Sequence, residues 1–567
     1  MRRTIFLAVA GLFLACTGCS SIQQQASQAE QPSTDTETLL AYQDEITTDF
    51  LRHHLSIFAA DSMEGRETAT EGQKKAARYL ANQYRLMDLQ PVGDDSTYYQ
   101  NFKLNAIQRD SVVFETFAME DGQKRSVSRA VASKNTTADY IRAFGGTDTL
   151  QGEIVFAGFG VNDPDRSIRH LEGVDLQGKW VMVFQEIPHM AGGDTLIDPS
   201  QSERVRLSTI LSRGAEGILL ISDMSSEAFR ESASGMQYDF KKPTDMRLAY
   251  RDAGAGSQAF SKGYNLISPE MAATLLQLDN AGSLAKYRQN LIENIDDFTP
   301  RALNFSLSQI PYHRKLSLET ENVLAFLEGA DPRLKDEIVV VTSHYDHVGI
   351  GRPDSTGDRI YNGADDDGSG TIGILNMARA FQLASQDGVY PKRSILFLNV
   401  TAEENGLLGS RYYSDHPVFP IEQTVVNLNT DMIGRIDEEH KQKGMEDYTY
   451  IIGSELISSD LDSLITTANR RSGQVELNKK YNDLQDPNQF YRRSDHWNFG
   501  RLGVPFAFFF TGVHEDYHRP SDEVHKIRFE KMARIVRTMY ASAVMIANAE
   551  KAPSVDNQEF IEITKEQ

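Results

Sequence analysis

The run Ile338-Val339-Val340-Val341-Thr342, followed at once by Ser343-His344-Tyr345-Asp346-His347, decides the fold class of this 567-residue chain. An unbroken run of apolar and β-branched residues predicts a strand that is buried on both faces, as in parallel sheets covered by helices. Three similar runs follow, at Ile395–Val400, Thr424–Leu428 and Pro505–Phe510. Each is also followed directly by polar or ionisable residues.

Helical patterns fill the gaps between these runs. They cover Thr371–Ser385 and Gly406–Tyr413, and a long closing helix is expected over Phe529–Ala549. Strands that alternate with helices indicate a mostly parallel sheet with helices on both faces. The sequence therefore predicts an α/β fold with a mostly parallel, mixed sheet flanked by helices.

The residues after the four predicted strands are rich in carboxylates and histidines. They are His344, Asp346, Glu403, Glu404, Asp431, Tyr517 and His518, and the cluster Asp365-Asp366-Asp367 precedes the helix after the first strand. Ligands of open α/β sheets bind at the carboxyl ends of the strands. Because carboxylates packed together repel one another and lose hydration, a bound divalent cation is the simplest compensation.

Each of these residues alone also has a purely structural interpretation. His344 is compatible with a hydrogen-bonded core histidine, Glu403-Glu404 with a solvated loop, and His518 with ordinary surface. Asp365–Asp367 is compatible with a helix cap. The position of all these groups at equivalent strand ends favours a shared cation site. Carboxylate and imidazole ligands suit Zn²⁺ in a hydrolytic site, with Mn²⁺ or Co²⁺ as substitutes.

Composition narrows the function further. The chain has 58 Lys and Arg against 80 Asp and Glu, a net charge of −22, which argues against binding to a nucleic-acid backbone. It is 40% hydrophobic, enough for a large core. Its two cysteines, Cys16 and Cys19, both lie in the first twenty residues. The rest of the chain therefore has neither a disulfide nor a cysteine ligand for a metal.

The N-terminus has the pattern of an export signal. Arg2 and Arg3 precede an apolar run over residues 5–15, which is too short to span a bilayer. The run ends in Thr17-Gly18-Cys19, which resembles a bacterial lipobox with Cys19 as the lipidated residue. Cys16 is an alternative, and so is a plain cleaved signal. We expect residues 1–19 to be a lipoprotein signal peptide and 20–42 a flexible tether that holds an exported protein on the cell-envelope membrane.

The body divides into four expected parts. Residues 43–140 and 313–552 form the two halves of the main α/β domain, residues 141–312 form a β-rich insertion, and residues 553–567 form a C-terminal tail. Buried strands are expected in the insertion at Ile154–Gly160, Trp180–Phe184 and Gly217–Ile221.

The strand-end motifs resemble those of the co-catalytic di-zinc aminopeptidases (clan MH metallopeptidases), which are related to glutamate carboxypeptidases, glutaminyl cyclases and the transferrin-receptor ectodomain. The matching segments begin at Ser343, Gly363, Ala402, Asn429 and His514, in the family's order and spacing. The resemblance implies a zinc-exopeptidase fold of the phosphorylase/hydrolase type. The insertion is similar to a protease-associated domain, through segments such as Val174–Val181.

The resemblance also implies a role for each site residue. His344 and Asp431 would bind one zinc ion, Glu404 and His518 a second, and Asp366 would bridge them. Asp346 would orient the first histidine, Glu403 would be the general base, and Tyr517 would stabilise the tetrahedral intermediate. Ser494-Asp495-His496-Trp497 matches another segment near the site, without an assigned role.

The expected activity is removal of N-terminal amino acids from peptide substrates. A carboxypeptidase or dipeptidase on the same scaffold is the nearest alternative, because Arg492, Arg493 and Arg519 lie close to site motifs and would attract a carboxylate. Glutaminyl cyclase is less well supported, because those enzymes work with one zinc ion and generally lack such an inserted domain. A non-catalytic binding protein is also less well supported, since every expected ligand and the base are present.

Overall fold

The structure is a computed structural model, and it describes residues 32–120, 123–144, 147–191, 194–251 and 264–565. The predicted signal peptide and Cys19 lie outside the described residues. Within the described ranges, no helix combines the length and the apolar character needed to cross a bilayer.

The main domain is built on the four predicted buried strands. They are β14 (Ile338–His344), β17 (Ser394–Val400), β18 (Thr424–Thr430) and β21 (Phe506–Phe510). They run parallel in the spatial order β21-β18-β14-β17. Antiparallel strands flank them: β19 (Tyr448–Ile452) beside β21 and the end of β13 (Arg301–Leu327) beside β17. The predicted mostly parallel, mixed sheet is confirmed.

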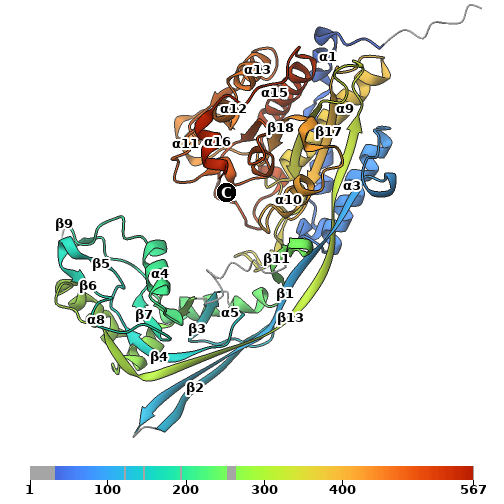
Figure 1. Cartoon of the computed structure of the whole chain (residues 1–567). Helices are drawn as coiled ribbons and strands as arrows, with labels where there is room; N and C mark the ends of the chain where they lie inside the picture. The colour runs from blue at the N-terminus through green and yellow to red at the C-terminus, as the bar shows by residue number, and fades with distance from the viewer. Residues whose placement is uncertain (1–31, 121–122, 145–146, 192–193, 252–263, 566–567) are drawn as a thin grey trace, which may run out of the picture.

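Helices cover both faces of this sheet (Figure 1). The helices α2 (Thr48–Phe58), α3 (Glu71–Leu86), α9 (Gly368–Gln386) and α15 (Phe529–Asn548) share one apolar core, and α10 (Leu408–Asp415) belongs to another. Successive residues of a strand point to opposite faces. Val339 and Val341 accordingly pack into the first core and Val340 into the second, which explains the unbroken apolar run of β14.

The insertion has a smaller sheet of the same kind. Its parallel strands are β4 (Leu150–Phe156), β7 (Trp180–Phe184), β10 (Gly217–Ile221) and β12 (Tyr264–Ile267). The helices α4 (Glu203–Ser212), α7 (Pro269–Leu275) and α8 (Ala281–Glu293) pack beside it. Its two apolar cores are separate from those of the main domain.

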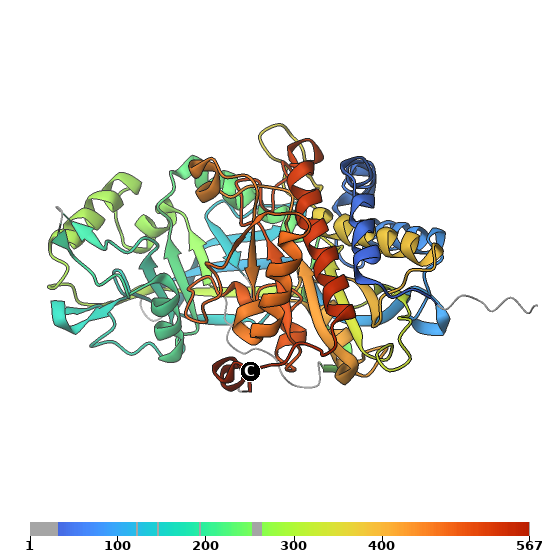
Figure 2. The ribbon, with the colours of Figure 1, turned by 90° about the horizontal axis from the view of Figure 1, so that it is seen from above.

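Two long strands join the parts. β1 (Tyr99–Glu120) pairs with β13 along nearly its whole length, and β13 pairs with β4 near its start and with β17 at its end. Figures 1 and 2 show this ribbon running from the main domain to the insertion. The predicted boundary at 312/313 lies inside β13, whose pairing with β1 continues on both sides of it. The boundary at 140/141 lies between β2 (Gln123–Ser133) and β3 (Ile141–Phe144).

The end of the predicted tether overlaps a helix. Residues Thr36–Ala41 form helix α1, which begins where the Asp35 side chain accepts a hydrogen bond from the Thr38 N–H. Leu39 and Leu40 are buried in the core of the main domain. Residues 36–41 of the predicted tether are therefore helical, and their leucines pack on the main domain.

Candidate metal centre

The predicted site residues lie at the carboxyl ends of four neighbouring strands. His344 is the last residue of β14, and Asp431 directly follows β18. Glu403 and Glu404 lie in the loop after β17, and His518 in the loop after β21. Asp366 lies just before α9, whose N-cap is Asp367. The fold thus brings together residues from five separate segments.

These side chains form two groups that share Asp366. His344, Asp366 and Asp431 make up the first group, and His347, Asp366, Glu404 and His518 the second, with the candidate ligand atoms of each group within 4.8 Å of one another. All five ligands implied by the family resemblance are included. His347 is an addition that the sequence analysis did not assign.

The first group has spacings that suit a cation. His344 Nε2 lies 3.3 Å from Asp366 Oδ1 and 3.6 Å from Asp431 Oδ1. Ligand atoms about 2.0–2.1 Å from a tetrahedral zinc ion are about 3.3 Å apart. Asp431 Oδ1 is buried without a hydrogen-bond partner among the described residues. Because orphaned buried oxygens are costly, this atom fits a ligand better than a structural acceptor.

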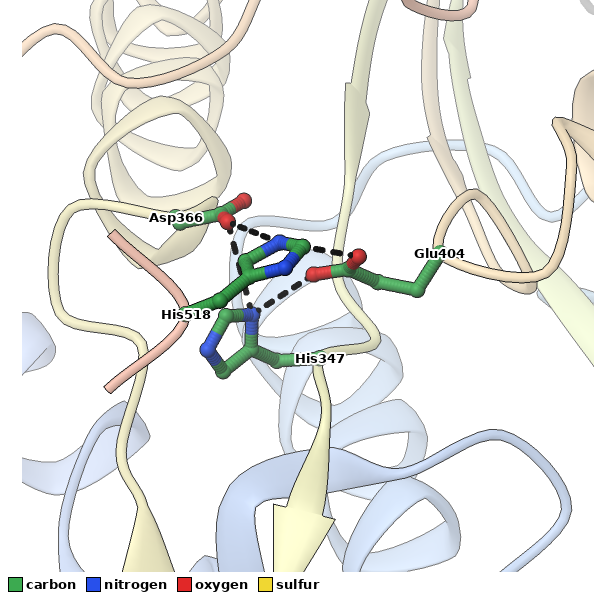
Figure 3. A group of neighbouring side chains, drawn as sticks. All are labelled: His347, Asp366, Glu404 and His518. Atoms are coloured by element: carbon green, nitrogen blue, oxygen red, sulfur yellow. Dashed lines mark hydrogen bonds and ion pairs between the residues drawn. The ribbon is translucent and has the colours of Figure 1, made fainter. Parts of the chain in front are cut away.

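The second group is similar and is drawn in Figure 3. His518 Nε2 lies 3.0 Å from Asp366 Oδ2 and 3.1 Å from Glu404 Oε2. Within the described part of the chain, both His518 Nε2 and Asp366 Oδ2 lack a partner with hydrogen-bond geometry. These two atoms are close to carboxylate or imidazole neighbours but are not hydrogen-bonded to them. The side chains present therefore fit a pair of divalent cations bridged by Asp366.

The predicted base lies beside the first group. Glu403 Oε2 is 4.0 Å from His344 Nε2, and the Glu403 backbone N–H donates to Asp346 Oδ1 at 3.2 Å. The other oxygen of Asp346 accepts the Thr68 hydroxyl at 2.8 Å. His344 Nδ1 is 3.1 Å from the backbone carbonyl of Asp346 and 3.8 Å from its carboxylate. Asp346 thus contacts both the histidine and the segment that carries Glu403, while the roles of these residues stay predictions.

Burial and mutual repulsion dominate the electrostatics. Burial raises the pKa of Glu403 well above its usual range. His344 opposes this increase, and the Glu404 and Asp431 carboxylates add to it. Burial lowers the pKa of His518, but the adjacent Asp366 and Glu404 carboxylates raise it to about 10 overall. The surroundings of Glu403 and His518 thus favour the protonated form of each. Since metal ligands must be deprotonated, a cation held by His518 would displace the proton of that histidine.

The predicted tyrosine packs on the last ligand. The rings of Tyr517 and His518 stack with centroids 3.8 Å apart. Burial, with help from the surrounding carboxylates, raises the pKa of Tyr517 above its usual value of 10. The phenol therefore keeps its proton at neutral pH and remains a hydrogen-bond donor.

Several supporting residues had no assigned role in the sequence analysis. The Ser494 hydroxyl donates to Asp431 Oδ2 at 2.9 Å, and the N–H groups of Asp365 and Asp366 donate to Asp522 Oδ2 at 3.0 and 3.2 Å. Their partners are distant in the chain. The only sequence signal for Ser494 was the motif match, which did not specify this contact.

Arg66 fixes the loops around the site. It is fully buried, and its guanidinium donates to the backbone carbonyls of Tyr345, Asn362 and Gly363 at 3.0, 2.7 and 2.9 Å. One side chain thus ties the loop after β14 to the segment before Asp366. Arg66 lies 279 residues before Tyr345, so this role has no signal in the local sequence.

Backbone strain is concentrated at the same strand ends. Ala402, Met432 and His518 have φ values of 56°, 55° and 53°, in the left-handed region that such residues rarely adopt. Ala402 precedes Glu403, and Met432 follows Asp431. Strain of this kind is typical of functional sites, where the surrounding structure enforces a particular side-chain direction.

A narrow pocket opens beside the two groups. Its lining includes Glu403, Asp431, Phe490, Arg493, Phe508 and Tyr517. Arg493 is exposed, and its guanidinium lies 4.8 Å from the centre of the Phe490 ring. Of the three arginines noted in the sequence, Arg493 is thus the one that lines this pocket.

Comparison with known proteins supports the fold and the family. Residues 322–543 match the model of peptidase family M28. Aminopeptidase YwaD of Bacillus subtilis is 30% identical over 226 residues, covering 38% of this chain and 43% of that protein. A probable leucine aminopeptidase 2 of Aspergillus oryzae is 31% identical over 202 residues, 34% of each chain. This chain thus matches less than half the length of each of these relatives.

Two solved structures resemble nearly the whole chain. An aminopeptidase from Aneurinibacillus sp. strain AM-1 has a TM-score of 0.52 at 17% identity, covering 92% of this chain and 97% of that one. The zinc aminopeptidase BSAP from Bacillus subtilis has a TM-score of 0.50 at 17% identity, covering 91% and 99%. These likenesses extend the shared fold to the insertion. The part of the chain that resembles peptidase family M28 in sequence is residues 322–543.

Proposed function

We propose that the protein is a zinc-dependent aminopeptidase that hydrolyses the N-terminal peptide bond of its substrates at a two-zinc centre. The observation that carries this proposal is the pair of ligand groups sharing Asp366, with the Glu403 carboxylate 4.0 Å from His344 Nε2 at their edge. The names of the M28 relatives, which are aminopeptidases, agree with it.

Five residues would hold the metal ions: His344 and Asp431 one, Glu404 and His518 the other, and Asp366 both. When bound, paired zinc ions lower the pKa of a coordinated water to about 7 and polarise a carbonyl group. This is the chemistry that peptide hydrolysis needs at neutral pH.

The chain's own residues would handle protons and developing charge. Glu403, with its raised pKa, accepts the proton of the attacking water and then donates it to the departing amine. Tyr517 keeps its proton and donates a hydrogen bond to the oxygen on which negative charge develops. Asp346 holds the Glu403 backbone N–H and so fixes the base relative to His344.

The acidic lining favours a substrate with a free α-amine. Asp366, Glu403 and Asp431 line the pocket, and Glu403, which belongs to neither ligand group, is the carboxylate left to attract a protonated amine once zinc is held. Aminoacyl-anilides, assayed with and without a chelator, test this directly. We expect release of the anilide from unblocked substrates only, and none from their N-acetylated forms. Equal rates on blocked substrates would contradict the assignment.

A carboxypeptidase or dipeptidase is the second candidate, and Arg493 is the observation that favours it. Its guanidinium lines the pocket and would pair with a substrate carboxylate. Sequencing the products of a linear peptide separates the candidates, because a carboxypeptidase shortens the opposite end. One zinc ion per chain with cyclisation of N-terminal glutamine would instead favour a glutaminyl cyclase.

We also propose that the protein is an exported lipoprotein of the bacterial cell envelope, anchored through Cys19. The support is the signal-like sequence before this cysteine. Labelling cells with a palmitate analogue tests it: label should be lost in Cys19→Ser and retained in Cys16→Ser. The reverse pattern would assign the lipid to Cys16.

A further inference from the structure

A third histidine at the centre has no place in the proposed mechanism. His347 lies three residues after His344, in the loop after β14, and its side chain is completely buried. Its Nδ1 lies 2.9 Å from Glu404 Oε1 with hydrogen-bond geometry, and 3.7 Å from Asp366 Oδ2. Figure 3 shows one nitrogen of this ring facing both Glu404 and Asp366, with dashed lines to each.

His347 differs from the two histidines that fit as ligands. Nε2 of His518 approaches its carboxylates without hydrogen-bond alignment, whereas Nδ1 of His347 is aligned with Glu404. A metal-bound histidine normally donates its other ring N–H to an acceptor. His344 has such an acceptor in the Asp346 carbonyl, 3.1 Å from Nδ1. Nε2 of His347 has none among the described residues, so this ring is better explained as a donor through Nδ1.

The first group contains a matching arrangement. Ser494 donates to Asp431 Oδ2, and Oδ1 is left free 3.6 Å from His344 Nε2. In the second group His347 holds Glu404 Oε1, and Oε2 is left 3.1 Å from His518 Nε2. In each group a side chain outside the five expected ligands contacts one carboxylate oxygen and leaves the other facing the cation position.

We propose that His347 is a positioning residue for the second cation: its Nδ1–H fixes Glu404 so that only Oε2 binds the metal. Ser494 would be its counterpart for the first cation. The inference rests on the two-cation centre of the proposed function, but it concerns metal affinity rather than peptide hydrolysis.

Zinc binding is the direct test. Four full-length proteins are dialysed against buffered zinc, and the bound zinc is measured by mass spectrometry. They are the wild type, His347→Ala, His347→Gln and the matched control Ser494→Ala. Loss of a hydrogen bond to a ligand lowers metal affinity about 10- to 100-fold. We expect such a loss for one of the two ions in H347A, partial recovery in H347Q, whose amide can still donate, and loss at the other ion in S494A.

Cobalt spectra distinguish a positioning residue from a ligand. At saturating Co²⁺, H347Q should keep the visible absorption spectrum of the wild type, because the atoms bound to the metal are unchanged. A shifted spectrum would make His347 a ligand and overturn the inference. Wild-type zinc affinity at both positions in H347A would overturn it as well.

Two controls keep the outcomes separate. Circular dichroism and thermal unfolding of the metal-free variants check that each is folded, and a variant that unfolds is replaced by His347→Asn, which keeps an amide donor of smaller size. Binding of fewer than two ions by the wild type would overturn both this inference and the proposed function. Two tightly bound ions without peptidase activity would overturn only the function.

Discussion

The main domain and the insertion share an architecture but differ at their strand ends. Both contain four parallel strands with helices beside them. In the main domain these strands lead into buried carboxylates and histidines that face one another. In the insertion β4, β7, β10 and β12 are followed by Ala157, Gln185, Ser222 and Ser268, and the described residues of the insertion contain no group suited to a metal.

Two buried histidines make the difference concrete. His170 of the insertion is fully buried, accepts the Phe159 N–H at Nδ1 at 3.0 Å, and lies 2.9 Å from the Ile295 carbonyl through Nε2. Burial lowers its pKa to about 4. The pKa of His518 instead rises to about 10 because carboxylates surround it. The parallel sheet alone therefore does not make a site. The charge of the groups around a buried histidine determines whether it is neutral, as His170 is, or lies among carboxylates, as His518 does.

Removal of metal should cause the largest difference between the two regions, because it should affect the site of the main domain and leave the insertion unchanged. Dialysis against a chelator should abolish hydrolysis of aminoacyl-anilides, because the water and the carbonyl group lose their activation. Zinc should restore the rate, with Co²⁺ or Mn²⁺ as substitutes. The stability of the insertion, followed by urea unfolding, should not change. Full activity in a chain shown to be free of metal would contradict the account.

Replacement of the proposed base should have the next largest effect. Glu403→Gln removes the proton acceptor but keeps the size of the side chain, so kcat should fall about 10²- to 10⁴-fold. The variant should still bind two zinc ions, since Glu403 belongs to neither ligand group. A near-normal kcat would exclude Glu403 as the base, and lost zinc would make it a ligand.

The tyrosine should matter somewhat less. Tyr517→Phe removes one donor to the developing oxyanion and should lower kcat by up to about 10²–10³-fold with little change in KM. The ring stacked on His518 is retained, which keeps the metal site intact. An unchanged kcat with a raised KM would mean that Tyr517 binds substrate rather than stabilising charge.

The smallest effect on activity is expected from the histidine of the insertion. The folded pKa of His170 is about 4 against 6.5 for the free side chain, so the unfolded chain takes up a proton first as the pH falls. The contribution of His170 to the free energy of unfolding is therefore complete above pH 6.5 and should fall by about 2 kcal/mol at pH 5.

Urea unfolding at pH 7.5 and pH 5 measures this contribution of His170 to the free energy of unfolding. The proteins compared are the metal-free wild type and metal-free His170→Gln. The variant should lose less stability on acidification, while its metal-loaded form keeps two zinc ions and most of its activity. Equal losses in the two proteins would show that His170 does not remain neutral in the fold. Loss of zinc from the variant would contradict the prediction that the insertion does not affect metal binding in the main domain.

Sequence patterns predicted the main sheet and its strand ends closely. The four apolar runs became β14, β17, β18 and β21 with bounds that differ by no more than two residues, because burial on both faces leaves a strong local signal. The strand-end residues then followed from parallel topology, which brings distant segments to one edge.

Features that depend on long-range pairing were missed. The 27-residue strand β13 crosses the predicted domain boundary because β1, some 200 residues earlier in the chain, pairs with it. The contacts of Arg66, Ser494 and His347 likewise join segments far apart in the sequence. A polar residue has no local signature that identifies such a partner, so these supporting roles required the structure.

Anomalous diffraction at the zinc edge tests the central claim most directly. Crystals of the full-length protein grown with zinc should show two strong peaks, one on each side of the Asp366 carboxylate and about 3.5 Å apart. One peak should lie beside His344 and the other beside His518. A single peak, or peaks that do not contact Asp366, would contradict the two-cation centre.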